Sequence, residues 1–208
     1  MADKLRPWYQ YPGAEAGVDE AGRGCLAGPV VAAAVILPRT FSLEGLNDSK
    51  QLSATRREQL RQQIEEQALA WSVAAVDNRL IDEMNILRAT WKAMHLAIQG
   101  LSLTPSFLLI DGKFFLPYPG IPSLCIIRGD SQYAGIAAAS ILAKTHRDRM
   151  MKELDNCYPQ YGWKKNKGYP TRSHREALLL YGPSPWHRRS FRLTEKQIEL
   201  SFPAAPEE

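Results

Sequence analysis

The chain has 208 residues, a formal net charge of +4 and three widely spaced cysteines, and it holds no apolar stretch of membrane-spanning length. This length allows one large domain, or one domain with a small appendage, around a substantial core. Three distant cysteines fit neither a disulfide framework nor a zinc site, so we expect a cytoplasmic protein that does not enter a membrane.

After a loose lead-in over residues 1–15, two adjacent carboxylates follow the first apolar segment. Residues 16–18 predict the beginning of a strand, which leads to Asp19 and Glu20. Gly22-Arg23-Gly24, called the 22–24 bend below, lets the backbone turn and approach a ligand closely because glycine has no Cβ. Neighbours on a regular strand point to opposite faces, so the two carboxylates share a site only if the chain leaves the strand near this bend. The apolar residues 30–37 then predict a buried strand.

Residues 38–100 predict a loop, a helix, a strand and a second helical region, in that order. The loop, residues 38–52, contains Ser49 and Lys50. Ser53 is a suitable N-cap for a helix that continues to about residue 69, and residues 71–76 predict a strand. The second helical region begins at residue 77, is interrupted near residue 85 and ends at Gly100.

Two more short apolar strands each lead to an aspartate. Residues 107–110 precede Asp111, and residues 124–127 precede Asp130. From residue 131 the chain is rich in alanine, which predicts a helix that packs closely on a sheet and becomes basic towards residue 151. Strands first, then strands alternating with helices, indicate an α/β domain with a mixed sheet, and we expect this domain to span residues 16–192.

Positive charge is concentrated late in the chain. From Lys144 to Arg192 there are twelve Lys or Arg and four Asp or Glu, a local charge of +8, whereas residues 1–143 sum to −1 and residues 193–208 to −3. The stretch includes an aromatic and basic loop at 158–170 and a last helix from Thr171 to Gly182. A basic region joined to a near-neutral core indicates affinity for phosphate, although a solvated cationic face would give the same count.

Four carboxylates share one context. Each stands at or just after the carboxyl end of a short apolar strand, where ligands bind in open α/β sheets: Asp19, Glu20, Asp111 and Asp130. Carboxylates gathered there repel one another unless a cation joins them, and hard divalent ions prefer oxygen ligands. Taken singly, each acid also fits a turn or a helix cap.

These motifs resemble, in order, those of type 2 ribonuclease H, also called ribonuclease HII. The segments that carry the resemblance are Asp-Glu-Ala-Gly-Arg-Gly at 19–24, Asp-Ser-Lys at 48–50, Ile-Asp-Gly at 110–112, Gly-Asp at 129–130, Ala-Ala-Ala-Ser-Ile-Leu-Ala-Lys at 137–144, Lys-Gly-Tyr-Pro-Thr at 167–171 and His-Arg-Arg-Ser-Phe at 187–191. They cover about residues 16–191, and the short stretch before them favours type 2 over the sibling type 3 enzyme.

The resemblance implies the ribonuclease H fold, a five-stranded mixed sheet flanked by helices, with a small basic helical extension at about residues 152–192. It implies cleavage of the RNA strand of RNA–DNA hybrids and incision 5′ of single ribonucleotides embedded in duplex DNA, which leaves 3′-hydroxyl and 5′-phosphate ends. It also implies that the four carboxylates are catalytic and hold two Mg²⁺ or Mn²⁺ ions, an arrangement that needs no protein nucleophile. Nothing indicates an assembly larger than a monomer.

The resemblance also implies substrate contacts. The backbone of Gly22, Arg23 and Gly24 would read the 2′-hydroxyl that marks RNA. Tyr169 would stack on the sugar of the next deoxynucleotide; without the resemblance, the sequence favours a loop tyrosine packed on Trp163 or Pro170. The other implied contacts are Ser49, Lys50, Lys144, Arg188 and Arg189. His187 receives no role, and we expect His146 at the surface.

The tail, residues 193–208, resembles the hexapeptide pattern by which bacterial replication proteins dock on the sliding clamp. The matching residues are Gln197, Ile198, Leu200 and Phe202. Three apolar anchors on a short tail suit a hydrophobic groove. A terminal helix packed on the domain would account for the same residues.

Two further functions remain open at this point. A nuclease of the same fold with another substrate, such as a junction resolvase, would have little use for a 2′-hydroxyl reader at the 22–24 bend or for Tyr169. A catalytically silent nucleic-acid-binding module would not need the acids at 19, 20, 111 and 130. Both features therefore favour the ribonuclease.

Overall fold

A five-stranded mixed sheet forms the centre of the structure. The computed structural model describes residues 5–9, 13–41 and 53–193. The strand order is β3-β2-β1-β4-β5, with β2 antiparallel to both its neighbours and β1, β4 and β5 parallel. The strands are β1 (Glu15–Ala21), β2 (Val30–Ile36), β3 (Ala70–Val76), β4 (Phe107–Asp111) and β5 (Ser123–Ile126). The fold class expected from the sequence is confirmed.

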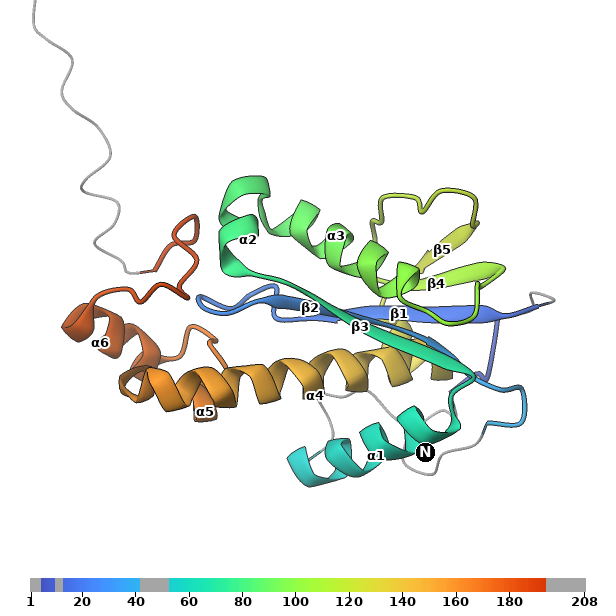
Figure 1. The fold of residues 1–208 in the computed structure, drawn as a ribbon, viewed down its shortest axis with the longest axis horizontal. Coiled ribbons are helices and arrows are strands. Elements are labelled where there is room, and N and C mark those ends of the chain that lie inside the picture. Colours follow the sequence, from blue (N-terminus) through green and yellow to red (C-terminus); the bar gives the residue numbers. More distant parts are fainter. Residues whose placement is uncertain (1–4, 10–12, 42–52, 194–208) are drawn as a thin grey trace, which may run out of the picture.

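Helices cover both faces of the sheet. Figure 1 shows α2 and α3 on one face, α4 with α1 on the other, and α6 beyond the end of the sheet. The helices are α1 (Ala54–Gln67), α2 (Asn78–Met84), α3 (Ile86–Gln99), α4 (Ala134–Cys157), α5 (Trp163–Asn166) and α6 (Arg172–Tyr181), with 3₁₀ turns at Gly129–Ser131 and Pro159–Tyr161. Within the described ranges, no helix is long and apolar enough to cross a membrane.

Local signals in the sequence account for several helix ends. The side chains of Ser53, Asp77 and Thr171 each accept a hydrogen bond from a backbone N–H three residues later, as N-caps do. Asn85 separates α2 from α3 with a positive φ of 70°, and its side chain caps α3. The expected interruption at residue 85 is therefore a real break in the helix.

Small residues let α4 lie directly on the sheet. A Cβ on Gly17 of β1 would stand 2.1 Å from the carbonyl carbon of Gly135 in α4, closer than atoms can approach. Ala138 and Ala139 of the same helix are fully buried against β2. The alanine-rich helix thus packs as closely as its composition predicts, and it brings its central part beside the end of β1.

Three expectations about local structure are wrong. The α4 helix begins at Ala134 rather than residue 131, because Asp130 lies in the preceding 3₁₀ turn. The segment 158–170 is not a plain loop, since it contains a 3₁₀ turn and α5. Finally, the chain does not leave the strand between Asp19 and Glu20: both residues pair in regular register with β2, opposite Ala33 and Ala32.

Candidate active site

Two aspartates meet at the carboxyl ends of the parallel strands β1 and β4. Asp19 lies one residue beyond the last β1–β4 pair, Val18 with Ile110, and Asp111 is the last residue of β4. The Asp19 side chain is buried and hydrogen-bonded to Ser140 of α4. Burial raises the pKa of Asp19 well above its usual value, and the charges of Glu20 and Asp111 raise it further. The three acids therefore form one electrostatic group.

Glu20 reaches this group from the other face of the sheet. Val18, two residues earlier, packs in the core on the α3 side, so strand alternation turns Glu20 to that side and Asp19 towards α4. Glu20 accepts a hydrogen bond from the Arg23 guanidinium at 3.1 Å. Glu20 and Asp111 line the same small cleft, of about 140 Å³, beside α3. The two neighbouring acids thus lie on opposite faces of the sheet near its end, and the strand between them is regular.

The fourth acid lies close by in the 3₁₀ turn after β5. Asp130 is buried, with 3% of its surface exposed. The backbone N–H of Gly129, its neighbour, donates to Asp111 Oδ1 at 2.7 Å. This hydrogen bond orients one Asp111 oxygen and fixes the turn that carries Asp130 to the end of β4.

The chemistry of these acids fits a hard divalent cation. In the part of the chain that the structure describes, no three His, Cys, Asp or Glu side chains already have the spacing of a bound metal site. The donors are nevertheless all carboxylate oxygens, and the pKa of Asp19 is raised first by burial and then by repulsion from the charges of Glu20 and Asp111. A divalent ion would remove that repulsion, so the residues fit the metal that the sequence implies.

The 22–24 bend follows the carboxylates and packs on a buried arginine. Gly22 has φ +97°, and a Cβ there would lie 2.0 Å from Arg147 Nε, so only glycine fits. Gly24 differs: among the described residues other than its two chain neighbours, no atom lies within 4 Å of its missing Cβ. Arg23 is half-exposed. The backbone of the bend is therefore open on the side of residues 23 and 24.

Tyr169 stands next to this bend. Its hydroxyl is hydrogen-bonded to the thiol of Cys25, and the residue is 38% exposed. Lys144 Nζ lies 5.5 Å from the ring centroid. Trp163, the alternative partner, stacks on Tyr161 with ring centroids 5.1 Å apart. Arg147 also lies over the ring, 6.0 Å from its centroid, so the partly exposed Tyr169 stands beside two cations and the bend.

Lys144 and Tyr169 border a wide basic groove. The groove has a volume of about 1020 Å³ and runs between α1, α4 and α5. Its cationic lining comprises Arg57, Lys144, Arg149, Lys152, Lys164, Lys165 and Lys167. Lys144 Nζ is also paired with Asp148 at 2.7 Å. Much of the charge counted in the sequence is therefore gathered on one surface.

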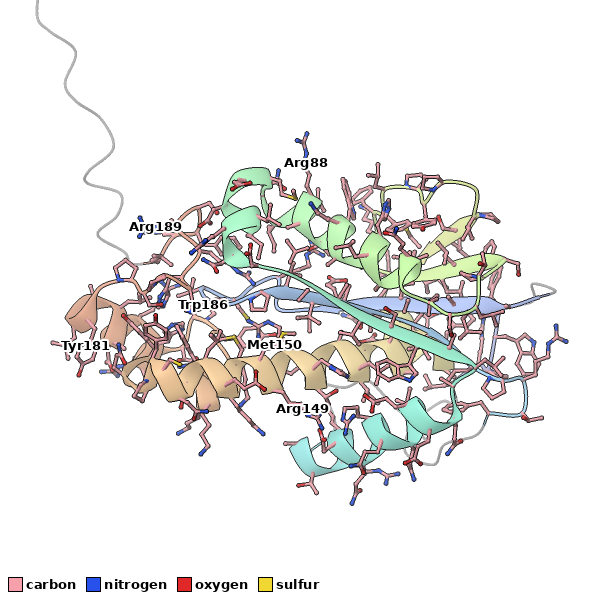
Figure 2. The ribbon with its side chains drawn as sticks, in the orientation of Figure 1. Arg88, Arg149, Met150, Tyr181, Trp186 and Arg189 are labelled. Carbon is pink, nitrogen blue, oxygen red and sulfur yellow. The ribbon has the colours of Figure 1, made fainter. Side chains whose placement is uncertain are left out.

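Arg188 lies inside the protein, where it cannot contact the substrate directly. It is fully buried, and its guanidinium donates to the carbonyl oxygens of Arg23, Gly28 and Pro29 at 2.9, 3.0 and 3.1 Å. The expectation of a phosphate contact is therefore corrected to a role in holding the 22–24 bend and the segment after it. Arg189 is exposed, and Figure 2 shows its side chain pointing outward.

The sequence did not predict the role of Arg147, a buried residue of α4 that binds the segment after the 22–24 bend. Its guanidinium donates to Pro29, Lys167 and Ala27 carbonyls at 2.9, 2.8 and 3.1 Å. In the sequence it is one of many basic residues on a predicted helix. The one signal of a special role is its place three residues after Lys144, which ends the motif at 137–144. The residues Ser49, Lys50, Gln197, Ile198, Leu200 and Phe202 lie outside the described residues.

Comparison with known proteins agrees with this geometry. The family model "Ribonuclease HII" matches residues 16–194. A ribonuclease HII of Parabacteroides distasonis is 54% identical over 198 residues, covering 95% of this chain and 100% of its own.

Solved structures show the same fold. The ribonuclease HII in a PCNA:RNase HII complex from Archaeoglobus fulgidus matches with a TM-score of 0.73 and 28% identity, over 89% of this chain and 98% of that chain. Bst-RNase HIII in complex with Mn²⁺ matches with a TM-score of 0.70 and 19% identity, over 89% of this chain and 69% of its own, and shows the fold alone. The chain therefore belongs to the ribonuclease HII family and is an endoribonuclease that acts on the RNA strand of RNA–DNA hybrids.

Proposed function

We propose that this enzyme requires divalent metal ions and also incises duplex DNA on the 5′ side of a single embedded ribonucleotide, leaving 3′-hydroxyl and 5′-phosphate ends. The observation that carries the proposal is the meeting of the buried Asp19 of β1 with Asp111 of β4 beside the open 22–24 bend. Hydrolysis and recognition of the 2′-hydroxyl would then take place side by side.

Asp19, Glu20, Asp111 and Asp130 would hold two ions, Mg²⁺ or Mn²⁺. When bound, such ions activate the attacking water and stabilise the leaving 3′-oxygen. The protein's part is to orient the acids: Ser140 hydrogen-bonds Asp19, and the Gly129 N–H holds Asp111. Arg23 pairs with Glu20 and keeps its carboxylate at the cleft.

Recognition of the ribonucleotide would fall to the bend and to Tyr169. The backbone of Gly22, Arg23 and Gly24 would contact the 2′-hydroxyl; the space at the missing Cβ of Gly24 is open among the described residues, which supports this contact. The exposed face of Tyr169 would stack on the sugar of the following deoxynucleotide. Phosphates would be bound by Lys144 and Arg189, and by Ser49 and Lys50 outside the described residues.

The test is cleavage of a labelled DNA duplex that contains one ribonucleotide, with Mg²⁺, with Mn²⁺ or with EDTA. An all-DNA duplex and an Asp19→Asn variant serve as controls. We expect a metal-dependent nick 5′ of the ribonucleotide that both controls lack. Binding without a nick would indicate a silent binding module, and cutting of the all-DNA duplex would indicate a nuclease with another substrate.

Asp19→Asn offers a second readout that separates folding from activity. Asparagine keeps the side-chain oxygen that accepts from the Glu20 N–H and removes one charge from the buried group. In metal-free buffer we therefore expect this variant to be at least as stable as the wild type while it is inactive. An inactive and strongly destabilised variant would instead show that Asp19 supports the fold.

We also propose that the tail recruits the enzyme to the bacterial sliding clamp through Gln197, Ile198, Leu200 and Phe202. The related Archaeoglobus enzyme occurs in a complex with PCNA, which supports a clamp partner. Deletion of residues 196–208 should abolish clamp binding measured by surface plasmon resonance, whereas deletion of residues 203–208 alone should retain it. Unchanged binding after the longer deletion would refute the proposal.

A further inference from the structure

Two buried imidazoles form a hydrogen-bonded chain beneath Tyr169. His174 in α6 and His187 in the C-terminal segment are 0% and 1% exposed, and their Nε2 atoms are 3.1 Å apart. His174 Nδ1 lies 2.9 Å from the Tyr169 carbonyl oxygen. His187 Nδ1 lies 2.9 Å from the backbone N–H of Ser184. Neither histidine belongs to the group of acids, and the chemistry described above uses neither.

The partners fix the direction of every hydrogen bond in this chain. A carbonyl oxygen only accepts, so His174 Nδ1 carries a proton; the Ser184 N–H only donates, so His187 Nδ1 carries none. In the neutral rings, His187 Nε2–H therefore donates to the bare Nε2 of His174. The indole N–H of Trp163 donates to the same His174 nitrogen at 3.0 Å. Burial keeps both rings neutral by lowering their pKa values, that of His187 to about 4.

The chain of imidazoles connects Tyr169 to the segment that follows the 22–24 bend. His187 forms an isolated bridge with Ala27, flanked by hydrogen bonds from Gly28 N–H to the Trp186 carbonyl at 2.9 Å and from Arg188 N–H to the Leu26 carbonyl at 2.8 Å. On the other side, the Leu26 N–H donates to the Gly168 carbonyl at 2.8 Å. Residues 26–28 are thus held between the strand-like segment at 186–188 and the residue before Tyr169.

The Tyr169 carbonyl uses both its lone pairs within this structure. One accepts from the Thr171 N–H at 2.8 Å, a local contact two residues along the chain, and the other accepts from His174 in α6. Of these two bonds, only the second links Tyr169 through His187 to residues 184–187, and this link adds to the bond between the Leu26 N–H and the Gly168 carbonyl. Without the His174 donor, this oxygen would keep only its local hydrogen bond from the Thr171 N–H.

We infer that His174 and His187 are positioning residues that hold Tyr169 at a set place relative to the 22–24 bend and thereby set the preference for an RNA–DNA junction. The inference rests on the proposed function, because the bend and Tyr169 are there assigned to the ribonucleotide and the next deoxynucleotide. A rigid spacing between those two contacts matters for a single embedded ribonucleotide. It matters less for a continuous hybrid, where the following sugar is also a ribose.

The test compares kcat/KM on a duplex with one ribonucleotide and on a continuous RNA–DNA hybrid. His174→Phe keeps the size of the ring but removes the donor to Tyr169, whereas His174→Asn keeps a donor at the position of Nδ1. We expect the Phe variant to lose roughly five- to tenfold of the preference for the single ribonucleotide, as the loss of one buried hydrogen bond predicts, and the Asn variant to lose much less. His95→Phe, a histidine on α3 whose ring contacts Phe115 and Tyr118, is the matched control.

Combination with Tyr169→Ala separates positioning from a general effect on stability. If His174 acts through the tyrosine ring, His174→Phe should change the substrate preference no further once that ring is absent. An equal, additive loss in both backgrounds would overturn the inference, as would an unchanged preference in the single variant. A wild type that cleaves the hybrid but not the single ribonucleotide would overturn the proposed function and this inference together.

A second measurement on the wild-type protein requires no variant to fold. Long-range ¹H–¹⁵N correlation spectra distinguish the tautomers of neutral histidines. The inference predicts a proton on Nδ1 of His174 and on Nε2 of His187 at pH 7. The opposite tautomer at His174 would remove the donor to Tyr169 and overturn it.

Discussion

At the scale of single residues, the two glycines of the 22–24 bend have different reasons to be glycine. Gly22 has positive φ and no room for a Cβ, because Arg147 fills the space. Gly24 has neither constraint from the residues that the structure describes. The described fold therefore explains the first glycine but not the second, and the proposed approach of substrate to the backbone would explain the second.

This difference gives a prediction for a pair of variants. Gly22→Ala should lower the free energy of unfolding by about 1–3 kcal/mol through strain and displacement of Arg147. Gly24→Ala should leave stability within about 0.5 kcal/mol of the wild type and still reduce cleavage at a ribonucleotide. Urea unfolding and kcat/KM on the same preparations check both. A Gly24→Ala enzyme with full activity would show that the backbone there does not approach the substrate.

At the scale of elements, two buried arginines join segments that are far apart in the sequence. Arg147 of α4 and Arg188 of the C-terminal segment each bind three carbonyl groups, and both bind Pro29. Burial lowers the pKa of Arg188 to about 10, which still leaves the guanidinium charged at neutral pH. The carbonyl oxygens replace water as hydrogen-bond acceptors around each buried cation. The same hydrogen bonds fix the chain between the bend and β2.

Replacement of one of these arginines should therefore loosen the whole region. We expect Arg147→Met to cost about 3 kcal/mol or more of stability, because three buried carbonyls lose a charged donor. Arg149→Met is the matched control on the same helix. Figure 2 shows Arg149 on the side of α4 that faces α1, where it is 44% exposed, so its loss should cost less than about 1 kcal/mol. Equal costs for the two variants, measured by urea unfolding, would contradict this account.

The elements also show which parts of the structure the sequence predicts and which it does not. The end of β4 at Asp111 and the helix starts marked by Ser53, Asp77 and Thr171 depend on neighbouring residues, and those predictions are confirmed. Asp19 and Glu20, in contrast, lie within β1 rather than after it. Burial of Arg188 depends on carbonyls about 160 residues earlier, so no local pattern distinguishes it from the exposed Arg189. The same holds for His174 and His187, whose contact forms only when α6 and the C-terminal segment pack together.

The two buried histidines also predict how stability depends on pH. In the folded protein the pKa of His187 is about 4, and that of His174 is lowered by burial and by the nearby Arg175 charge. The unfolded chain binds protons near its ordinary pKa of about 6.5, so between about pH 6.5 and 4 it holds more protons than the folded state. Stability from these residues is therefore complete above pH 6.5 and falls as the pH decreases, by at most about 3 kcal/mol for His187.

The measurement is the difference between the unfolding free energies of the wild type and His187→Gln, taken from pH 7.5 to 4.5. Asp19, whose pKa is raised, changes the stability with pH in the opposite direction. Its contribution is present in both proteins and cancels in the difference, which therefore reports on the histidine. We expect the advantage of the wild type to shrink steadily below pH 6.5. An advantage that does not change with pH would show that His187 is not held neutral.

At the scale of the whole molecule, the basic groove and the acidic group occupy different parts of the surface. The acids lie at the end of the sheet, and the cations line the groove between α1, α4 and α5, with Tyr169 on its border. Basic residues on one surface attract the phosphate backbone, while the acidic group at the end of the sheet repels it until metal ions neutralise the acids. Metal loading and substrate binding should therefore support each other.

The groove predicts the salt dependence of substrate binding. Each Lys that neutralises a phosphate contributes about 0.9 to the slope of log Kd against log salt concentration. Simultaneous replacement of Lys152, Lys164 and Lys165 by Gln should therefore lower the slope by roughly 2–3 and weaken binding of hybrids and all-DNA duplexes alike. Arg39→Gln is the control, since this exposed residue follows β2, at the end of the sheet opposite the acids. Fluorescence anisotropy between 50 and 300 mM salt gives both slopes, and a triple variant with the wild-type slope would place the duplex on another surface.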